Sequence, residues 1–249
     1  MGKKKGKDIA VTVKNLDIYY KDIKRVSIVK SGIKDLLNAK EFHAVKNVSF
    51  EIPKGEILGI CGKNGSGKST LLRAIAGIFS ADSGLIDLHG NTVSLLSIGV
   101  GFQRRLSGYE NIFLSGLLLG YSEEQIKERL DEIIEFSELG DFIYKPVTSY
   151  SSGMYSKLAF AITAILETDI MLIDEVLSVG DVRFQQKSYA KMKELISDEN
   201  RTVIIVSHSS RTLKDLCDRV IWINDGVLMG DGDPVEIVTK YEEYMKNLD

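Results

Sequence analysis

The segment that decides the fold reads Gly62-Lys63-Asn64-Gly65-Ser66-Gly67-Lys68-Ser69-Thr70. Its spacing is G-x-x-x-x-G-K-[ST], the pattern of a phosphate-binding loop. An apolar run at residues 57–61 precedes it as a buried strand would, and a helical run at 71–76 follows it. Glycines let backbone N–H groups turn around phosphate oxygens at the positive end of a helix. The segment therefore predicts a nucleoside triphosphate site.

Two side chains of this loop have separate predicted roles. We expect Lys68 to reach the β- and γ-phosphates and the Ser69 hydroxyl to ligate Mg²⁺. Further contacts to the nucleotide are expected from Gly62, Asn64, Gly65, Ser66, Gly67 and Thr70.

The composition fits one domain over residues 1–249, because 44% hydrophobic residues in a chain of this length can bury a full core. No run of 18 or more apolar residues occurs, so we expect no membrane span. The Lys-rich N-terminus lacks the apolar stretch of a secretory signal. Cys61 and Cys217 are too few for a disulfide framework, which favours a reduced, cytosolic setting.

Charge is unevenly distributed around a net value of −3. Residues 1–40 contain 11 Lys or Arg and 4 Asp or Glu, whereas residues 41–249 contain 21 and 31. A basic leading segment on an acidic body can meet anionic lipid headgroups or an anionic polymer. A solvated tail followed by a charged helix face is the alternative.

The first half of the chain reads mostly as strands. Residues 9–20 alternate and are rich in β-branched and aromatic types, which predicts an edge strand. Residues 43–52 and 84–100 also have strand character. Residues 21–40 differ, because apolar side chains fall at helical spacing among lysines. This insertion is a basic amphipathic segment, or a segment that simply packs against the sheet.

The second half begins with a helical period from about 106 to 166, and we assign a helical subdomain to residues 104–166. Ser122 and Gln125 form a predicted capping box inside it. Alternation of strands and helices then returns at 169–173, 184–198, 202–206 and 210–217. This order indicates an α/β fold with a helical insertion.

Three polar groups follow predicted strands or open a predicted helix. Asp174 and Glu175 end an apolar strand, where the first acid can order Mg²⁺ and the second can orient the attacking water. His208 follows a strand expected to neighbour Asp174 and can hydrogen-bond the γ-phosphate. Residues 150–154 precede a helical run and offer a second anion site. The alternatives without a functional role are an exposed acidic pair at Asp174 and Glu175, a structural histidine at His208, and an ordinary helix cap at residues 150–154.

The ordered set of these motifs, with Gln103 between them, resembles the ATP-binding cassette (ABC) ATPases over essentially the whole chain. The resemblance implies an α/β fold with a RecA-like core, an antiparallel β subdomain and a helical subdomain. It implies ATP and Mg²⁺ as ligands. It makes Gln103 the glutamine that touches Mg²⁺ and the coupling region, Glu175 the catalytic glutamate, and His208 the switch histidine.

The same resemblance assigns further nucleotide contacts. Ser151 and Gly153 stand in the family signature segment, and Asp181 closes the D-loop. Tyr20 resembles the aromatic residue that stacks on adenine. Phe42 is a rival for that role, because the insertion at 21–40 blurs the alignment.

A narrower resemblance is to exporters of lipid-linked polysaccharides, O-antigen or wall teichoic acid. It rests on residues 101–103, 108–112, 150–154 and 174–181, and on the basic insertion, which in such exporters forms a gating helix at the membrane face. The sequence departs from the family signature at Ser152 and Met154. Arg104-Arg105 stands where the subgroup more often has Pro-Glu. No carbohydrate-binding domain follows within 249 residues, which favours teichoic acid or an O-antigen system lacking that domain.

The sequence therefore predicts the ATP-hydrolysing subunit of an exporter, working as a homodimer at the cytoplasmic face of the cell membrane. We expect it to dock a separate multi-span permease through residues 100–120, as a peripheral membrane-associated subunit that binds no nucleic acid. A soluble ABC ATPase acting on nucleic acid or ribosomes is a rival that the acidic body disfavours. A regulatory module without turnover is disfavoured by the intact Lys68, Asp174, Glu175 and His208.

Overall fold

The computed structural model describes residues 8–21, 41–96, 101–174, 180–198 and 201–247. The expected basic insertion, apart from Lys21, and the expected catalytic Glu175 lie outside these residues. Among the described residues, no helix is both long enough and apolar enough to cross a membrane.

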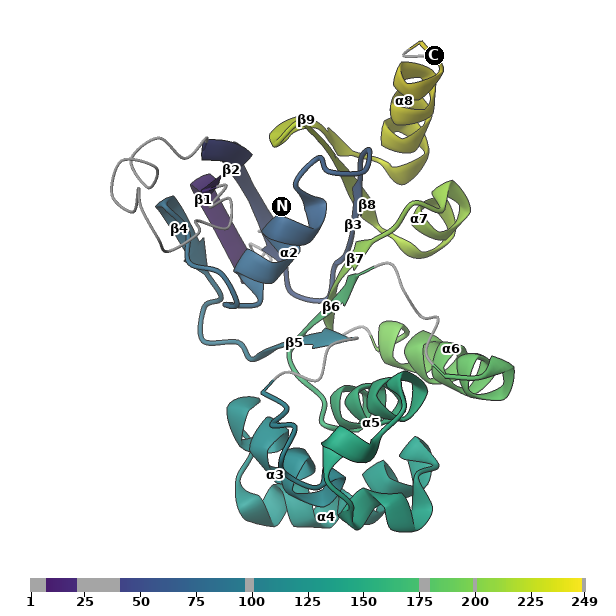
Figure 1. Cartoon of the computed structure of the whole chain (residues 1–249). Coiled ribbons are helices and arrows are strands. Elements are labelled where there is room, and N and C mark those ends of the chain that lie inside the picture. The colour runs from purple at the N-terminus through teal and green to yellow at the C-terminus, as the bar shows by residue number, and fades with distance from the viewer. Residues whose placement is uncertain (1–7, 22–40, 97–100, 175–179, 199–200, 248–249) are drawn as a thin grey trace, which may run out of the picture.

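A six-stranded sheet forms the centre of the molecule (Figure 1). Its strands are β3 (Ile57–Cys61), β5 (Val93–Leu96), β6 (Ile170–Asp174), β7 (Thr202–Val206), β8 (Arg219–Asn224) and β9 (Val227–Gly232). Their order is β5-β6-β7-β3-β8-β9, and only the β8–β9 pair is antiparallel. Every residue of β7 is buried. Strands β3, β6 and β7 are continuous apolar runs because helices or a second sheet cover both faces of a parallel sheet.

A three-stranded antiparallel sheet lies beside the first. It contains β1 (Ile9–Lys21), β2 (Glu41–Pro53) and β4 (Ser83–Asp87) in the order β2-β1-β4. The prediction of an edge strand over residues 9–20 was wrong, because β1 is the central strand of this sheet. Alternation of polar and apolar residues indicates that one face of a strand is buried. It does not indicate whether the strand pairs with one neighbouring strand or with two.

Helix α2 (Lys68–Ile75) lies between the two sheets (Figure 1). The other face of the large sheet is covered by α6 (Val182–Ile196), α7 (Ser210–Leu216) and α8 (Pro234–Lys246). This arrangement fixes the start of α2 against the carboxyl ends of the parallel strands, where ligands bind in open α/β sheets.

The remaining helices gather at one end of the molecule (Figure 1). They are α3 (Gly108–Leu118), α4 (Glu123–Ser137) and α5 (Ser152–Ile165), with short 3₁₀ turns η1 (Gly140–Tyr144) and η2 (Val147–Ser149). They share a core of their own that includes Ile112, Ile126 and Leu158. The predicted capping box is confirmed: Ser122 Oγ accepts from the Gln125 N–H at 3.3 Å, and Gln125 Oε1 accepts from the Ser122 N–H at 2.8 Å.

Candidate functional site

The phosphate-loop segment connects β3 to α2, as the sequence predicts. Gly62 has a φ of 149°, and a Cβ added to it would lie 2.0 Å from the carbonyl oxygen of Ile223. Gly67 has a φ of 104°, and a Cβ there would lie 2.3 Å from the carbonyl oxygen of Ala44. Both positions therefore require glycine because of the path of the chain itself.

Lys68 is buried at the start of α2, with 5% of its surface exposed. Its Nζ donates to the carbonyl oxygens of Gly62 at 2.8 Å and Lys63 at 2.9 Å. A buried ammonium needs such partners, because burying an unpaired charge is costly. Charged phosphate oxygens are stronger acceptors than carbonyls. The ammonium is thus already positioned in the loop and can exchange these bonds for phosphate.

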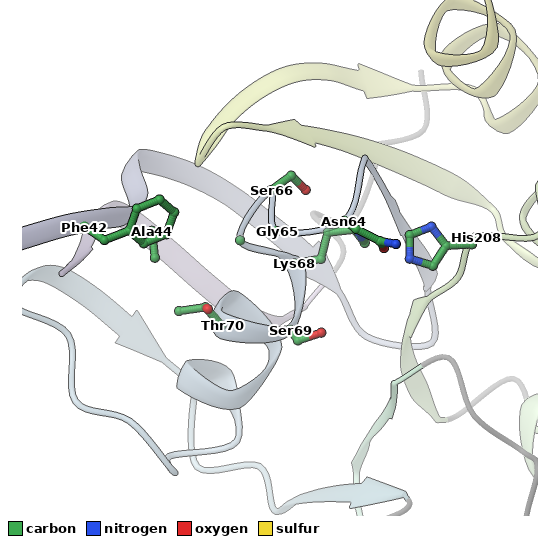
Figure 2. A pocket seen from close by; sticks show the side chains of 10 residues that line it. Phe42, Ala44, Asn64, Gly65, Ser66, Lys68, Ser69, Thr70 and His208 are labelled. Carbon is green, nitrogen blue, oxygen red and sulfur yellow. The ribbon is translucent and has the colours of Figure 1, made fainter. Parts of the chain in front are cut away.

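A cavity of about 240 Å³ opens at the loop (Figure 2). It is lined by Phe42, Ala44, Asn64, Gly65, Ser66, Gly67, Lys68, Ser69, Thr70 and His208. His208 reaches it from the end of β7, and Figure 2 shows His208 and Phe42 on opposite sides of the loop. The structure thus joins the predicted loop residues to His208. Ala44 carries no chemical signal that would have identified it from sequence.

Ser69 and Asp174 meet beside this cavity, although 105 positions separate them in sequence. Ser69 Oγ donates to Asp174 Oδ1 at 3.2 Å. Asp174 ends β6, which pairs with β7 as the sequence predicts. A hydroxyl and a carboxylate oxygen are ligands that Mg²⁺ prefers, and this ion usually keeps several waters beside one or two protein oxygens and substrate phosphates. The pair fits such an ion.

Tyr20 and Phe42 sit opposite each other in the β1–β2 ladder. The Tyr20 hydroxyl lies 3.2 Å from Thr70 Oγ1, and its ring makes an edge contact with Phe79 at 5.9 Å between centroids. Phe42 is 58% exposed and lines the cavity, whereas Tyr20 is not among its described lining residues. The geometry favours Phe42 as the exposed aromatic face.

The second predicted anion site lies at the start of α5, away from α2 (Figure 1). Ser151 is the N-cap, and its Oγ accepts from the Met154 N–H at 3.2 Å. Ser151, Ser152 and Arg104 help to line a second cavity, of about 460 Å³. The two sets of described lining residues have no member in common. One chain therefore does not bring Ser151 and Gly153 to its own phosphate loop.

Gln103 is held by its backbone through Asn111, a residue that the sequence analysis includes in segment 108–112 without giving it a role. The buried Asn111 accepts from the Gln103 N–H at 2.7 Å and donates to the Gln103 carbonyl at 3.1 Å. The available signal was an amide within a largely apolar helical run, since buried amides need partners. The Gln103 residue itself is exposed and is not among the described residues lining the phosphate-loop cavity.

Asp181 also lies outside the described lining of the phosphate-loop cavity. Its Oδ1 accepts from the Phe184 N–H at 3.0 Å and caps α6, and its Oδ2 lies 2.8 Å from Lys157 Nζ. The bond from Lys157 lowers the pKa of this carboxyl to about 2. Both carboxylate oxygens thus have partners within the chain.

A phosphate loop on an α/β sheet, with Ser69, Asp174 and His208 gathered around it, defines a nucleotide-binding domain. The sequence profile of the ABC transporter family matches residues 45–178. The chain belongs to the ABC transporter family. The predicted ABC nucleotide-binding fold is thereby confirmed.

Relatives with curated names point to export systems. The chain is 47% identical over 223 residues to a teichoic acids export ATP-binding protein of Lactococcus lactis, covering 90% of this chain and 47% of the relative. It is 40% identical over 227 residues to an O-antigen export ATP-binding protein of Klebsiella pneumoniae, covering 87% of this chain and 92% of the relative. The chain thus spans about half the length of the first relative and nearly all of the second.

Solved structures show the same fold. A dimeric ATP-binding cassette bound to ADP and Pi has a TM-score of 0.67 at 22% identity, covering 90% of this chain and 98% of that one. An ATP-binding subunit of an ABC transporter has a TM-score of 0.70 at 19% identity, covering 94% and 93%.

Proposed function

We propose that this protein is the ATP-hydrolysing subunit of an ABC exporter that moves a lipid-linked cell-envelope polymer, wall teichoic acid, across the cytoplasmic membrane. The main support for this proposal is that Lys68, Ser69 and His208 line the same cavity, where Ser69 donates a hydrogen bond to Asp174. The identity to a teichoic acids export ATP-binding protein supports the choice of polymer.

The chemistry follows from the groups around the loop. Lys68 releases the carbonyls of Gly62 and Lys63 and donates to β- and γ-phosphate oxygens, and the loop N–H groups hold the remaining oxygens. Ser69 and Asp174, with Gln103, would hold Mg²⁺, which neutralises charge on the phosphates. His208 donates to the γ-phosphate, and Glu175 orients the attacking water.

The separation of the two anion-binding regions supports a homodimer. Ser151 and Gly153 of one copy close over the phosphate loop of the other, so two ATP molecules are held between two chains. Tighter binding of ATP to the closed dimer than to the open one supplies the free energy for movement.

A third cavity supports docking on a separate permease. It has a volume of about 320 Å³ and lies between the end of α2, β5 and the end of α3. Its lining includes Ile78 and Leu118, which are 45% and 60% exposed. An apolar hollow of this kind fits an amphipathic helix of a membrane subunit. Docking there would hold the protein at the cytoplasmic face of the membrane.

Export of O-antigen is the second candidate. It is favoured by the near-complete coverage of the Klebsiella pneumoniae relative. The two polymers are distinguished by expressing this chain with the permease encoded beside it in strains blocked in one export pathway. Restored surface teichoic acid supports the first candidate, and restored surface O-antigen supports the second.

Turnover and docking are tested on purified protein. Glu175→Gln should retain ATP binding and stop hydrolysis; hydrolysis near the wild-type rate would contradict the role of Glu175.

Leu118→Glu should abolish co-purification with the multi-span permease. Leu85→Glu is the matched control, because Leu85 is similarly exposed, at 53%, on β4 away from the hollow. Recovery with ribosomes instead of a membrane protein would support the nucleic-acid rival.

A further inference from the structure

The turn between β8 and β9 lies against the phosphate loop (Figure 2). The Gly226 N–H of this turn donates to the carbonyl oxygen of Ser66 at 2.9 Å. Lys63 Nζ lies 2.8 Å from one carboxylate oxygen of Asp225 and 3.0 Å from the other. The turn is therefore bonded to the loop at two points, through the side chain of Lys63 and through the backbone of Ser66.

The turn itself has a fixed shape. Asn224 and Val227 pair across it, so Asp225 and Gly226 are the two residues of a tight hairpin loop. Their φ values are 47° and 83°, and a type I′ turn requires positive φ at both positions. Behind the turn, Asn224 Nδ2 donates to the hydroxyl of Tyr244 on α8 at 3.1 Å. The turn thus presents a well-defined surface to the loop.

Lys63 connects this turn to the buried ammonium of Lys68. The side chain of Lys63 is bonded to Asp225, while its carbonyl oxygen accepts from Lys68 Nζ at 2.9 Å. The hydrogen bond to Asp225 raises the pKa of Lys63, so its ammonium is charged at neutral pH. Asp225 is not among the described residues lining the phosphate-loop cavity. It can therefore act on the nucleotide site only through the loop or through its charge.

We propose that Asp225 is a positioning residue that holds the empty phosphate loop in the conformation that ATP binds, and that it acts through Lys63. This inference rests on the proposed ATPase function. A loop that is ordered before binding loses less conformational freedom when ATP arrives, so its affinity is higher. Because the Lys63 and Asp225 side chains are 34% and 59% exposed, we expect a modest effect, about two- to fivefold in affinity.

The first test is Asp225→Asn. Asn-Gly is strongly favoured in type I′ turns, so the turn and the melting temperature should be retained while the charge is lost. For the isolated protein, Kd for a fluorescent ATP analogue should rise about two- to fivefold. KM for ATP should rise by the same factor, with kcat within about twofold, because bound ATP orders the loop itself. Hydrogen exchange of the amides of residues 62–67 should become faster in the nucleotide-free variant.

Asp231→Asn is the matched control. Asp231 belongs to the same hairpin and carries the same charge, but its carboxylate lies 3.4 Å from Arg219 at the other end of β8. Kd and loop exchange in this variant should match the wild type. Equal weakening of binding in the two variants would overturn the inference, because it would indicate a general effect of charge or of hairpin stability.

A double-variant cycle distinguishes positioning from a direct effect of charge on ATP. If the pair positions the loop, Lys63→Met should raise Kd as much as Asp225→Asn does. The double variant should then be no weaker than either single one, as expected for two residues acting through one bond. If the charges instead act directly on ATP, Asp225→Asn should tighten binding and Lys63→Met should weaken it, with the double variant near the wild type. That second pattern would overturn the inference.

Two further outcomes separate this inference from the proposed function. Unchanged loop exchange in Asp225→Asn would overturn the positioning role and leave the ATPase proposal intact. A wild-type protein that binds nucleotide but hydrolyses no ATP with its permease would refute the proposed function. The measurements of Kd and of loop exchange on the isolated protein would still decide the role of Asp225.

Discussion

The phosphate loop and the start of α5 both offer a helix N-terminus to an anion, yet they differ in what their glycines do. Gly62 and Gly67 adopt backbone conformations and close approaches that the chain itself imposes. Gly153 is helical, and a Cβ added to it would meet only Ser151 Oγ, at an ordinary 3.8 Å. Among the described residues of one chain, no atom approaches Gly153 closely enough to require glycine there. The backbone path thus accounts for Gly62 and Gly67 in the first region, whereas the contacts of the described residues leave Gly153 in the second region unexplained.

Removal of the Lys68 ammonium should have the largest effect on the phosphate loop. For Lys68→Met we expect at least about a 100-fold loss of kcat, because the ammonium meets the charge that develops on the phosphates. Steady-state phosphate release measures it. Lys63→Met is the control, because the Lys63 ammonium is 2.8 Å from Asp225. Comparable losses in the two variants would remove the special role of Lys68.

Gly153→Ala tests the second region. Alanine is favoured over glycine in a helix by roughly 0.5–1 kcal/mol, so the free energy of unfolding should be unchanged or raised. Hydrolysis should nevertheless fall about tenfold, because a methyl group would obstruct the approach of the other copy's nucleotide. Thermal denaturation and phosphate release on one preparation check both effects. Gly67→Ala should instead destabilise the fold. A Gly153→Ala protein with full activity would contradict the shared site.

Phe42 and Tyr20 are the two candidates for the aromatic ring that stacks on adenine beside the phosphate loop. Stacking of an aromatic ring on a base contributes roughly 1–3 kcal/mol, so Phe42→Ala should raise KM for ATP about tenfold with kcat little changed. Tyr20→Phe removes only the hydroxyl contact with Thr70, worth about 1 kcal/mol of stability. Measuring the hydrolysis rate as a function of ATP concentration gives KM for each variant and distinguishes the two residues. A larger rise in KM for Tyr20→Ala than for Phe42→Ala would return the stacking role to Tyr20.

Thiol reactivity should distinguish the buried Cys61 beside the phosphate loop from a cysteine introduced at the start of α5, and this is the smallest of the expected effects. Burial raises the pKa of Cys61, at the end of β3, to about 12. Its neutral thiol therefore dominates at pH 8, with a thiolate fraction on the order of 10⁻⁴. We expect no alkylation by iodoacetamide until the protein unfolds. A Ser152→Cys thiol should react quickly, and ATP should protect it in a Glu175→Gln background. Mass spectrometry distinguishes the sites.

Local chemistry made much of this structure predictable. The strand 202–206 and the Ser122–Gln125 capping box depend on neighbours in sequence, and both were found as predicted. The meeting of Ser69 with Asp174 was inferred from a motif order and a sheet edge. The central place of β1 could not be predicted, because it depends on pairing with the distant β4. The partners of Lys157 and Asn111 likewise depend on tertiary packing.

The β1–β2 ladder, which runs as far as the Lys21–Glu41 pair, has an evolutionary consequence. Tyr20 and Phe42 lie next to that last pair, one bonded to the phosphate-loop helix and the other lining the cavity. A hairpin tip accepts added residues without disturbing the sheet behind it. Sequence inserted between 21 and 41 therefore begins and ends one residue from Tyr20 and Phe42, beside the phosphate-loop cavity. The length and sequence of this insertion can therefore change while the phosphate-loop cavity behind it stays the same.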